Sequence, residues 1–445
     1  MQTIKFLGAA GGVTGSSYLF TAANGSSLLI DLGIFQGPPD SVRLNFQPLA
    51  FDARTLTAAV LTHAHLDHCG RLPLLVKAGF SGRIYATQPT LDIARVSLLD
   101  SAALAQEENQ NPVLFTREDV DAVFRLTQVV SYDQPFSAGN FNLTFRNAGH
   151  ILGSASIEIS AQPTVVFSGD LGNTPEDLIA PTEYITSAAA VVMESTYGDS
   201  AHPSEDVPTI LQREINTVEK SGAVLLIPAF SIERTQEIIH LIGHLKQHQA
   251  VDVNTPVYLD SPMAIEVMEI FKQYPNLYNS ELKSDPHPFD FPHLVLTRTV
   301  AESQAIRDTP GAKVIIAGSG MMSGGRIIHH LKNYLSHGQT RLLIVGYQAE
   351  GTLGREIESG ARDVSILGTT IPVRATITKL ESLSSHADQP RLLNWLRHIH
   401  GVKQVFLTHG DTHQREALAQ KIKSELGISD VILPVAFQVC DLTSG

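Results

Sequence analysis

Apolar runs of a few residues alternate with helical segments between about residue 205 and residue 360 of this 445-residue chain. The strands expected from these runs are Ala223–Ile227, Val257–Leu259, Val314–Ala317 and Leu342–Val345. Each of the first three runs is followed by a segment expected to form a helix. Strands that alternate with helices join as βαβ units, so this block predicts a parallel sheet covered by helices.

The residues on either side of this block, 1–204 and 361–445, carry a different pattern. Short β-prone runs separated by glycine-rich and Asn-Gly turns dominate the first 70 residues. A helix expected over Leu91–Ala105 precedes further strands, and mixed character resumes after residue 361 with a strand expected over Ile371–Ile377. We expect these segments to bury their sheets between layers of helices, which makes the whole chain an α/β protein.

The composition excludes several classes of protein. No apolar run reaches the roughly 18 residues of a transmembrane helix, and the first residues lack the pattern of a signal peptide. The two cysteines, Cys69 and Cys440, are too few for a disulfide framework or a cysteine-rich zinc module, so we expect a cytoplasmic protein with no membrane partner. The 45 acidic and 32 basic residues give a formal charge of −13, which argues against a protein that coats nucleic acid but does not exclude a nucleic-acid enzyme.

Three histidines and an aspartate follow the apolar run Thr57–Thr62, where the chain is expected to leave a sheet. Imidazole and carboxylate groups suit zinc and similar cations. In a loop, His63 and His65 can bind one metal ion while Asp67 and His68 reach a second. The spacing therefore predicts a metal-binding loop.

A pair of metal ions needs more ligands than one loop supplies. His150, Asp170 and His409 each follow an expected strand, where a rigid sheet can aim a side chain. Taken singly, each of them also fits an ordinary turn residue.

The order of these residues is similar to that of a known fold. Asp31, the His63–His68 motif, His150 and Asp170 resemble the successive motifs of the metallo-β-lactamase fold. The parallel block between Asp170 and His409 resembles in its position the inserted domain of the β-CASP nucleases. The resemblance implies a metallo-β-lactamase αββα sandwich made of residues 1–204 and 361–445, with an inserted β-CASP domain at 205–360.

The resemblance also implies a dinuclear site with two zinc ions, for which manganese or iron are alternatives. One ion would be bound by His63, His65 and His150, the other by Asp67, His68 and His409, and Asp170 would bridge them. Asp31 would support the metal loop from behind. In this motif the RNA-acting members of the family have a histidine, whereas many DNA-acting members have an aliphatic residue. His409 therefore resembles the RNA-acting members.

Two further motifs resemble those of the β-CASP nucleases. Glu194 ends an expected strand within Val192–Gly198, and His386 lies within Leu383–Asp388. Phosphodiester hydrolysis needs a nucleophile and an acid for the leaving oxygen. A zinc-bound hydroxide and His386 are the candidates for these roles, with Glu194 orienting the imidazole. We count Asp67, Glu194 and His386 as catalytic, and a structural hydrogen bond between domains is the alternative for Glu194 and His386.

Three glycine-rich segments follow strands of the central block and resemble β-CASP segments that face the substrate. Glycine allows close backbone approach, and ligands bind at the carboxyl ends of parallel strands. A plain turn is the alternative for each segment, and Phe230 and Tyr347 could either stack on bases or pack between the domains. The expected substrate-binding residues are Ser231, Arg234, Ser319, Gly320, Ser323, Gly324, Arg326 and Tyr347.

Three other histidines, His240, His244 and His248, recur at the i, i+4 spacing of a helix face. For these we favour a solvated face over a further metal site.

The resemblance implies a ribonuclease that hydrolyses single-stranded RNA in a cleft between the two domains. Alternatives are a small-molecule ester or thioester hydrolase on the same scaffold, a DNA-acting nuclease of the family, and a non-catalytic RNA-processing scaffold. The choice between endonuclease and 5′-exonuclease, the natural RNA target and its sequence preference, the metal identity and the oligomeric state stay open, a homodimer being one option.

Overall fold

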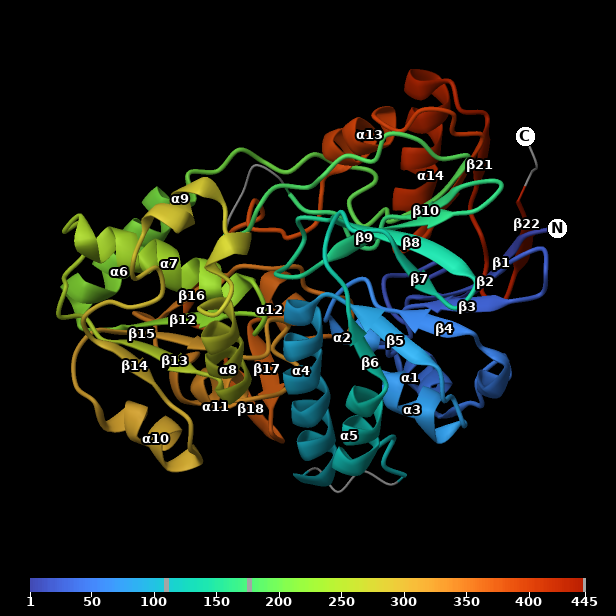
Figure 1. Ribbon diagram of the computed structural model, residues 1–445. Coiled ribbons are helices and arrows are strands. Elements are labelled where there is room, and N and C mark those ends of the chain that lie inside the picture. The colour runs from blue at the N-terminus through green and yellow to red at the C-terminus, as the bar shows by residue number, and fades with distance from the viewer. Residues whose placement is uncertain (108–111, 174–177, 443–445) are drawn as a thin grey trace. The chain divides into compact units, whose positions relative to one another are not determined.

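The computed structural model describes residues 1–107, 112–173 and 178–442 (Figure 1). The chain divides into two compact units. Unit 1 consists of Met1–Ala201 and Ser385–Gly445, and unit 2 of His202–Ser384. Within the described part of the chain, no helix has both the length and the apolar character needed to cross a membrane.

Unit 1 contains two seven-stranded sheets. The first sheet has the order β22 (Val439–Asp441), β1 (Thr3–Gly8), β2 (Ser17–Thr21), β3 (Ser27–Ile30), β4 (Ala58–Val60), β5 (Arg83–Ala86), β6 (Thr127–Val129). The second has the order β21 (Asp430–Ile432), β20 (Gln404–Leu407), β11 (Ala190–Met193), β10 (Val165–Phe167), β9 (Ala155–Ser160), β8 (Phe141–Asn147), β7 (Phe136–Ala138). Each sheet joins an antiparallel part, such as β1–β2–β3, to a parallel part, such as β3–β4–β5–β6.

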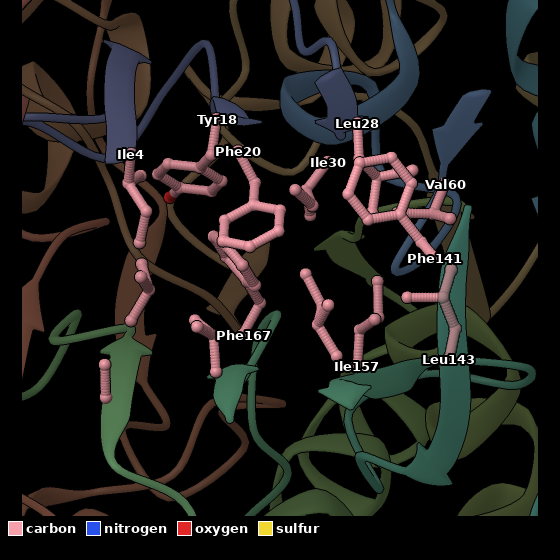
Figure 2. Close-up of a cluster of buried hydrophobic side chains, with 14 of the residues drawn as sticks. Ile4, Tyr18, Phe20, Leu28, Ile30, Val60, Phe141, Leu143, Ile157 and Phe167 are labelled. Carbon is pink, nitrogen blue, oxygen red and sulfur yellow. The ribbon is translucent and has the colours of Figure 1, made fainter. Parts of the chain in front are cut away.

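The two sheets of unit 1 pack face to face around one apolar core. Alternate residues of a strand point to the same face, so Tyr18 and Phe20 of β2 both turn inward. Figure 2 shows Phe20 and Ile30 of the first sheet opposite Phe167 and Ile157 of the second. Because this core packs both sheets together, the strand ends of each sheet are held in place.

Helices cover the outer faces of the sandwich. Leu392 and Leu396 of α13 (Gln389–Arg397) and Leu418 of α14 (Thr412–Lys421) pack against Val191 and Val405 of the second sheet. On the first sheet lie α3 (Leu72–Lys77), α4 (Gln88–Glu107) and α5 (Arg117–Arg125) (Figure 1). The shorter helical segments are α1 (Pro39–Arg43), η1 (Leu44–Phe46), η2 (Ala53–Thr55), α2 (Leu66–Cys69) and η5 (Ile422–Leu426). This is the αββα arrangement that the resemblance to the metallo-β-lactamase fold implies.

Unit 2 is built on one parallel sheet, as predicted. Its strand order is β14 (Leu294–Leu296), β13 (Val257–Asp260), β15 (Lys313–Ala317), β12 (Val224–Pro228), β16 (Arg341–Ile344), β19 (Thr376–Lys379), and every neighbouring pair is parallel. A separate hairpin joins β17 (Asp363–Ile366) to β18 (Thr369–Pro372). The helical segments are α6 (Val207–Ser221), α7 (Arg234–Gln247), α8 (Pro262–Phe271), η3 (Pro275–Leu277), α9 (Ser280–Ser284), α10 (Val300–Ala305), η4 (Ile306–Asp308), α11 (Ile327–Tyr334) and α12 (Leu353–Glu358).

The division into units differs from the segments expected from the sequence at its second boundary. The expected inserted block ends at residue 360, whereas unit 2 extends to Ser384. The reason is that β19 pairs with β16 along its full length and so completes the sheet of unit 2. The strand expected over Ile371–Ile377 is also divided, because residues 373–375 interrupt it between β18 and β19.

Candidate metal centre

The histidine motif lies where the chain leaves the buried strand β4 of unit 1. His63 follows this strand, and His65 precedes the one-turn helix α2, which carries Asp67 and His68. The Nδ1 atom of His65 lies 3.2 Å from His63 Nε2 and 3.1 Å from His150 Nε2. Ligand atoms bound 2.0–2.1 Å from a tetrahedral zinc ion would be about 3.3 Å apart. The spacing of these three nitrogen atoms therefore fits a shared cation.

Asp170, which follows β10, lies beside this group. Its Oδ2 atom is 3.4 Å from His63 Nε2 and 3.7 Å from His150 Nε2. The ligand atoms of His63, His65, His150 and Asp170 all lie within 4.8 Å of one another.

A second group of potential ligands consists of Asp67, His68 and His409. The Oδ2 atom of Asp170 is 3.3 Å from His68 Nε2 and 3.6 Å from His409 Nε2. The Nε2 atom of His409 is also 3.9 Å from Asp67 Oδ2. One carboxylate oxygen thus borders both groups, which is the position that a bridging ligand requires.

Two polar atoms of this cluster fit the presence of cations. His68 Nε2 and Asp170 Oδ1 are buried and have no hydrogen-bond partner among the described residues. Leaving such atoms unsatisfied typically costs about 1–3 kcal/mol each. Borderline cations such as zinc take imidazole nitrogen and carboxylate oxygen, so these residues fit a metal site.

Hydrogen bonds behind the cluster fix which imidazole nitrogen faces inward. His68 Nδ1 donates to Asp31 Oδ2 at 2.7 Å, and the same carboxylate accepts from the backbone N–H and the hydroxyl of Thr62. His150 Nδ1 donates to the Ser385 carbonyl oxygen at 2.9 Å. In each case Nε2 is the nitrogen that faces the cluster, and it can bind a cation when the imidazole is neutral. Asp31 thus lies where the sequence predicts a supporting residue.

Burial keeps most of these imidazoles uncharged. It lowers the pKa of His65 and of His409 to about 3, and it lowers the pKa of His63 and of His150 well below the usual value. His68 is the exception, because the carboxylates of Asp170 and Asp31 outweigh burial and raise its pKa. Neutral imidazole is the form that binds metal, so four of the five are ready at pH 7.

The two carboxylates of the cluster have opposite pKa shifts. Burial raises the pKa of Asp67 to about 6. Burial acts in the same direction on Asp170, but electrostatic interactions with the imidazoles of His409, His68 and His63 outweigh it and hold its pKa well below the usual value. Asp170 is therefore an anion in the middle of the imidazoles.

Glu194 and His386 form a pair beside this cluster. Glu194 follows β11 and is buried, and its Oε1 atom accepts from the Leu171 N–H at 2.7 Å and lies 3.2 Å from His386 Nδ1. Burial acts to lower the pKa of His386, but the charge of Glu194 raises it to about 9. His386 Nδ1 is 4.0 Å from Asp170 Oδ2. Both members of the pair belong to unit 1, so their hydrogen bond is not one between domains.

The glycine-rich segments of unit 2 meet at the carboxyl ends of β12, β15 and β16. The Nε2 atom of Gln348 donates to the carbonyl oxygens of Gly320 and Gly346, each at 3.0 Å. A Cβ atom on Gly320 would lie 2.8 Å from the ring of Phe230, so a side chain there would displace this ring. Phe230 is 38% exposed and Tyr347 is 54% exposed.

The serines of these segments make local contacts. The hydroxyl of Ser231 lies 3.2 Å from that of Ser261, and Ser319 Oγ accepts from the Ser323 N–H at 3.1 Å. The Ser319 N–H lies 3.4 Å from the Gly324 carbonyl oxygen, which closes a small loop. Six of the expected substrate-binding residues thus lie in the loops at this end of the sheet: Ser231, Ser319, Gly320, Ser323, Gly324 and Tyr347.

The two arginines expected to bind substrate have internal partners. Arg234 is buried and forms an ion pair with Glu237. The guanidinium of Arg326 donates to Asp260 Oδ1 at 2.7 Å and to the carbonyl oxygens of Thr297 and Arg298. Their charges are therefore used within unit 2, which differs from the expectation.

Sequence reasoning missed several residues that position these sites. Asp260 ends β13 and binds both Arg326 and His330, and its place at a strand end was the signal that could have found it. Ser16, whose hydroxyl is 2.9 Å from His409 Nδ1, gives no such signal because 393 residues separate the two.

Three family models match the chain. A metallo-β-lactamase superfamily domain covers residues 21–196, a Beta-Casp domain covers residues 235–357, and a Zn-dependent metallo-hydrolase RNA specificity domain covers residues 370–434. The first and third contain the expected ligands, and the second lies within unit 2. Their order is that of a metallo-β-lactamase domain interrupted by an insertion.

Curated relatives extend over nearly the whole chain. Ribonuclease TTHA0252 of Thermus thermophilus is 37% identical over 427 residues, which cover 94% of this chain and 95% of the relative. Transcription termination factor FttA is 31% identical in both Methanocaldococcus jannaschii and Pyrococcus horikoshii. These alignments cover 92% and 93% of this chain and 67% of each relative. The chain therefore belongs to the β-CASP family of metallo-β-lactamase-fold ribonucleases.

Proposed function

We propose that this protein hydrolyses phosphodiester bonds of single-stranded RNA with two metal ions, preferentially zinc. The observation that carries the proposal is the pair of ligand groups that share the Asp170 carboxylate. His63, His65 and His150 would hold one ion, Asp67, His68 and His409 the other, and Asp170 would border both. Bound there, the ions would activate water and offset the negative charge of the phosphate.

His386 is the proposed acid of the reaction. Glu194 accepts a hydrogen bond from His386 Nδ1 and raises the pKa of the imidazole, so His386 is protonated at neutral pH. The Nε2 proton can then pass to the oxygen that leaves when the phosphodiester bond breaks. Glu194 acts as a positioning residue, because it holds the imidazole and its charge.

The loops at the carboxyl ends of the unit 2 strands are the proposed RNA-binding surface. Glycines in these loops let the backbone approach phosphate, and the exposed rings of Phe230 and Tyr347 can stack on unpaired bases. A base within a duplex is already stacked, so we propose single strands as the substrate. The names of the family model and of the Thermus relative, which refer to RNA and to a ribonuclease, support RNA over DNA.

The test uses the purified protein, analysed for bound metals, with four substrates. These are one 5′-labelled single-stranded RNA, its duplex, a single-stranded DNA of the same sequence and a chromogenic thioester. We expect cleavage of the single-stranded RNA alone, and mapping of the products distinguishes internal cuts from stepwise 5′ removal. Equal cleavage of the duplex or the DNA would contradict the proposed substrate, and thioester turnover that rivals RNA cleavage would favour a small-molecule hydrolase.

A further inference from the structure

A separate group of metal-ligand side chains lies in unit 2. His240 and His244 are on α7, and Asp285 is the C-cap residue that directly follows α9. Ligand atoms of these three side chains all lie within 4.8 Å of one another. None of the three belongs to the cluster in unit 1, and the proposed reaction does not use them.

The helix places the two imidazoles side by side. Residues four apart lie on the same face of a helix, and the ring centroids of His240 and His244 are 4.2 Å apart. The Nε2 atom of His244 is 3.7 Å from Asp285 Oδ2. That carboxylate is held in place, because Oδ1 accepts from the backbone N–H of His287 at 2.9 Å. The separation between His244 and Asp285 is within a few tenths of an ångström of the roughly 3.3 Å between ligands of tetrahedral zinc, and the other ligand atoms lie within 4.8 Å.

The inner histidine is set in the tautomer that binds metal. His240 is buried, and its Nδ1 atom lies 3.1 Å from the carbonyl oxygen of Pro288. A carbonyl oxygen can only accept, so Nδ1 carries the proton and Nε2 keeps its lone pair. Metal-bound histidines commonly have this contact behind them. Burial and the neighbouring His244 lower the pKa of His240, which keeps it neutral at pH 7.

The structure replaces one member of the group that the sequence suggests. His248 continues the i, i+4 spacing, and its Nδ1 atom donates to the His244 carbonyl oxygen at 2.8 Å, but its side chain does not reach the group. Its ring centroid is 6.2 Å from that of His244, compared with 4.2 Å for His240. Asp285, from another element, takes the third position instead, and the exposed carboxylate of Glu281 lies 4.0 Å from His244 Nδ1.

We propose that His240, His244 and Asp285 form an additional metal site, which binds Zn²⁺ or a similar divalent cation and clamps α7 to the end of α9. Two imidazoles and a carboxylate are a common ligand set for such ions, and three protein ligands leave a position for water. Because the ligands come from two elements, binding would stabilise the fold of unit 2. The site is independent of the proposed activity of unit 1.

The test measures zinc content at equilibrium with a buffered micromolar concentration of free Zn²⁺. His244→Ala and Asp285→Asn remove or weaken a ligand, and His248→Ala is the matched control on the same helix. We expect His244→Ala to bind one zinc ion fewer per chain than the unsubstituted protein. Asp285→Asn should bind that ion at least about tenfold more weakly, and His248→Ala should bind as the unsubstituted protein does. Equal zinc content in the unsubstituted protein and His244→Ala, or a loss in His248→Ala, would overturn the proposed ligand set.

Thermal unfolding provides a second measurement. Zinc should raise the unfolding midpoint by more in the unsubstituted protein and in His248→Ala than in His244→Ala. Should His244→Ala fail to fold, Asp285→Asn decides the question because its side chain keeps the same shape. If zinc changes the midpoint equally in all folded variants, His244 and Asp285 form only an ion pair and the proposal is wrong.

Discussion

At the scale of single residues, Asp170 is the group on which the candidate metal centre depends. Its Oδ2 atom lies within 4.0 Å of the Nε2 atom of each of four histidines, His63, His68, His150 and His409. Removing this carboxylate leaves both ligand groups without their shared anion. The imidazoles alone would then hold cations less tightly.

We expect Asp170→Ala to lose bound metal and RNA cleavage together. The control is Asp363→Ala, which removes an exposed carboxylate of β17. Elemental analysis and cleavage of labelled RNA are measured on the same preparations. Retention of both ions by a folded Asp170→Ala variant would show that this carboxylate is not a ligand.

His386→Ala should keep its metal ions and slow cleavage by roughly 10²–10⁴-fold, the usual contribution of a general acid. An unchanged rate would exclude the acid role.

The pH dependence of the rate tests the same role, because His386 can donate a proton only when its imidazole is protonated. Activity of the unsubstituted protein should fall as pH rises through about 9, the value to which Glu194 raises the pKa of His386.

Glu194→Gln should move this alkaline decline to lower pH. The amide keeps the shape of the side chain but removes the negative charge that favours the imidazolium. The measurement is kcat for RNA cleavage against pH in both proteins. An alkaline limb at the same pH in both would mean that Glu194 only packs beside His386.

At the scale of elements, the ends of strands carry both the candidate metal centre of unit 1 and the proposed RNA-binding loops of unit 2. Asp260 at the end of β13 binds Arg326 and His330, which come from the start of α11 and from within it. Asp260→Ala would remove the buried carboxylate that binds the half-buried Arg326 and the buried His330, for which we expect a loss of about 3–5 kcal/mol in the free energy of unfolding. Urea unfolding measures it, with Asp308→Ala in an exposed position as the control. A loss no larger than that of the control would contradict this assignment.

The same contact predicts a dependence of stability on pH. Burial acts to raise the pKa of Asp260, but hydrogen bonds from His330, Ser303, Thr297 and Arg326 lower it to about 2. A carboxylate with a lowered pKa stabilises the fold above its unfolded value, near 4, and loses that contribution as pH falls towards 2. The difference in stability between the unsubstituted protein and Asp260→Ala should therefore shrink across this range in urea titrations.

The exposed ring of Tyr347, at the end of β16, is expected to contribute to RNA binding. Stacking of a base on an aromatic ring contributes about 1–3 kcal/mol, so Tyr347→Ala should raise KM for single-stranded RNA by roughly 5–150-fold with little change in kcat. Tyr184→Ala, which removes an exposed ring of unit 1, is the control. Unchanged KM would remove Tyr347 from the proposed surface.

Sequence reasoning reached most of these elements but not all of their contacts. Four strands of the parallel sheet, β12, β13, β15 and β16, are predictable because each contains a continuous apolar run. The internal partners of Arg234 and Arg326 could not be predicted, because a basic residue near glycines looks the same whether it faces substrate or Asp260. The extension of unit 2 beyond the expected boundary at residue 360 could not be predicted either, since the pairing of β19 with β16 joins segments that are distant in the chain.

At the scale of the whole molecule, the candidate metal centre joins the two sheets of unit 1. His63 follows β4 of the first sheet, whereas Asp170 and His409 follow β10 and β20 of the second. Metal bound only by the folded protein stabilises it by RT ln(1 + [L]/Kd), or about 3–4 kcal/mol at 100–1,000 times Kd. Chelation should therefore lower the unfolding midpoint and abolish cleavage, and added Zn²⁺ should restore both. Cleavage that survives complete metal removal would contradict the proposed chemistry.

In the sequence, unit 2 lies between the two segments of unit 1, so it is synthesised after the first segment and before the second. The ribosome makes His63, His150 and Asp170 first, then the whole of His202–Ser384, and only afterwards His386 and His409. A nascent chain therefore cannot assemble the complete cluster until His409 has been synthesised. The proposed nuclease therefore cannot become active before the whole of unit 2 has been synthesised.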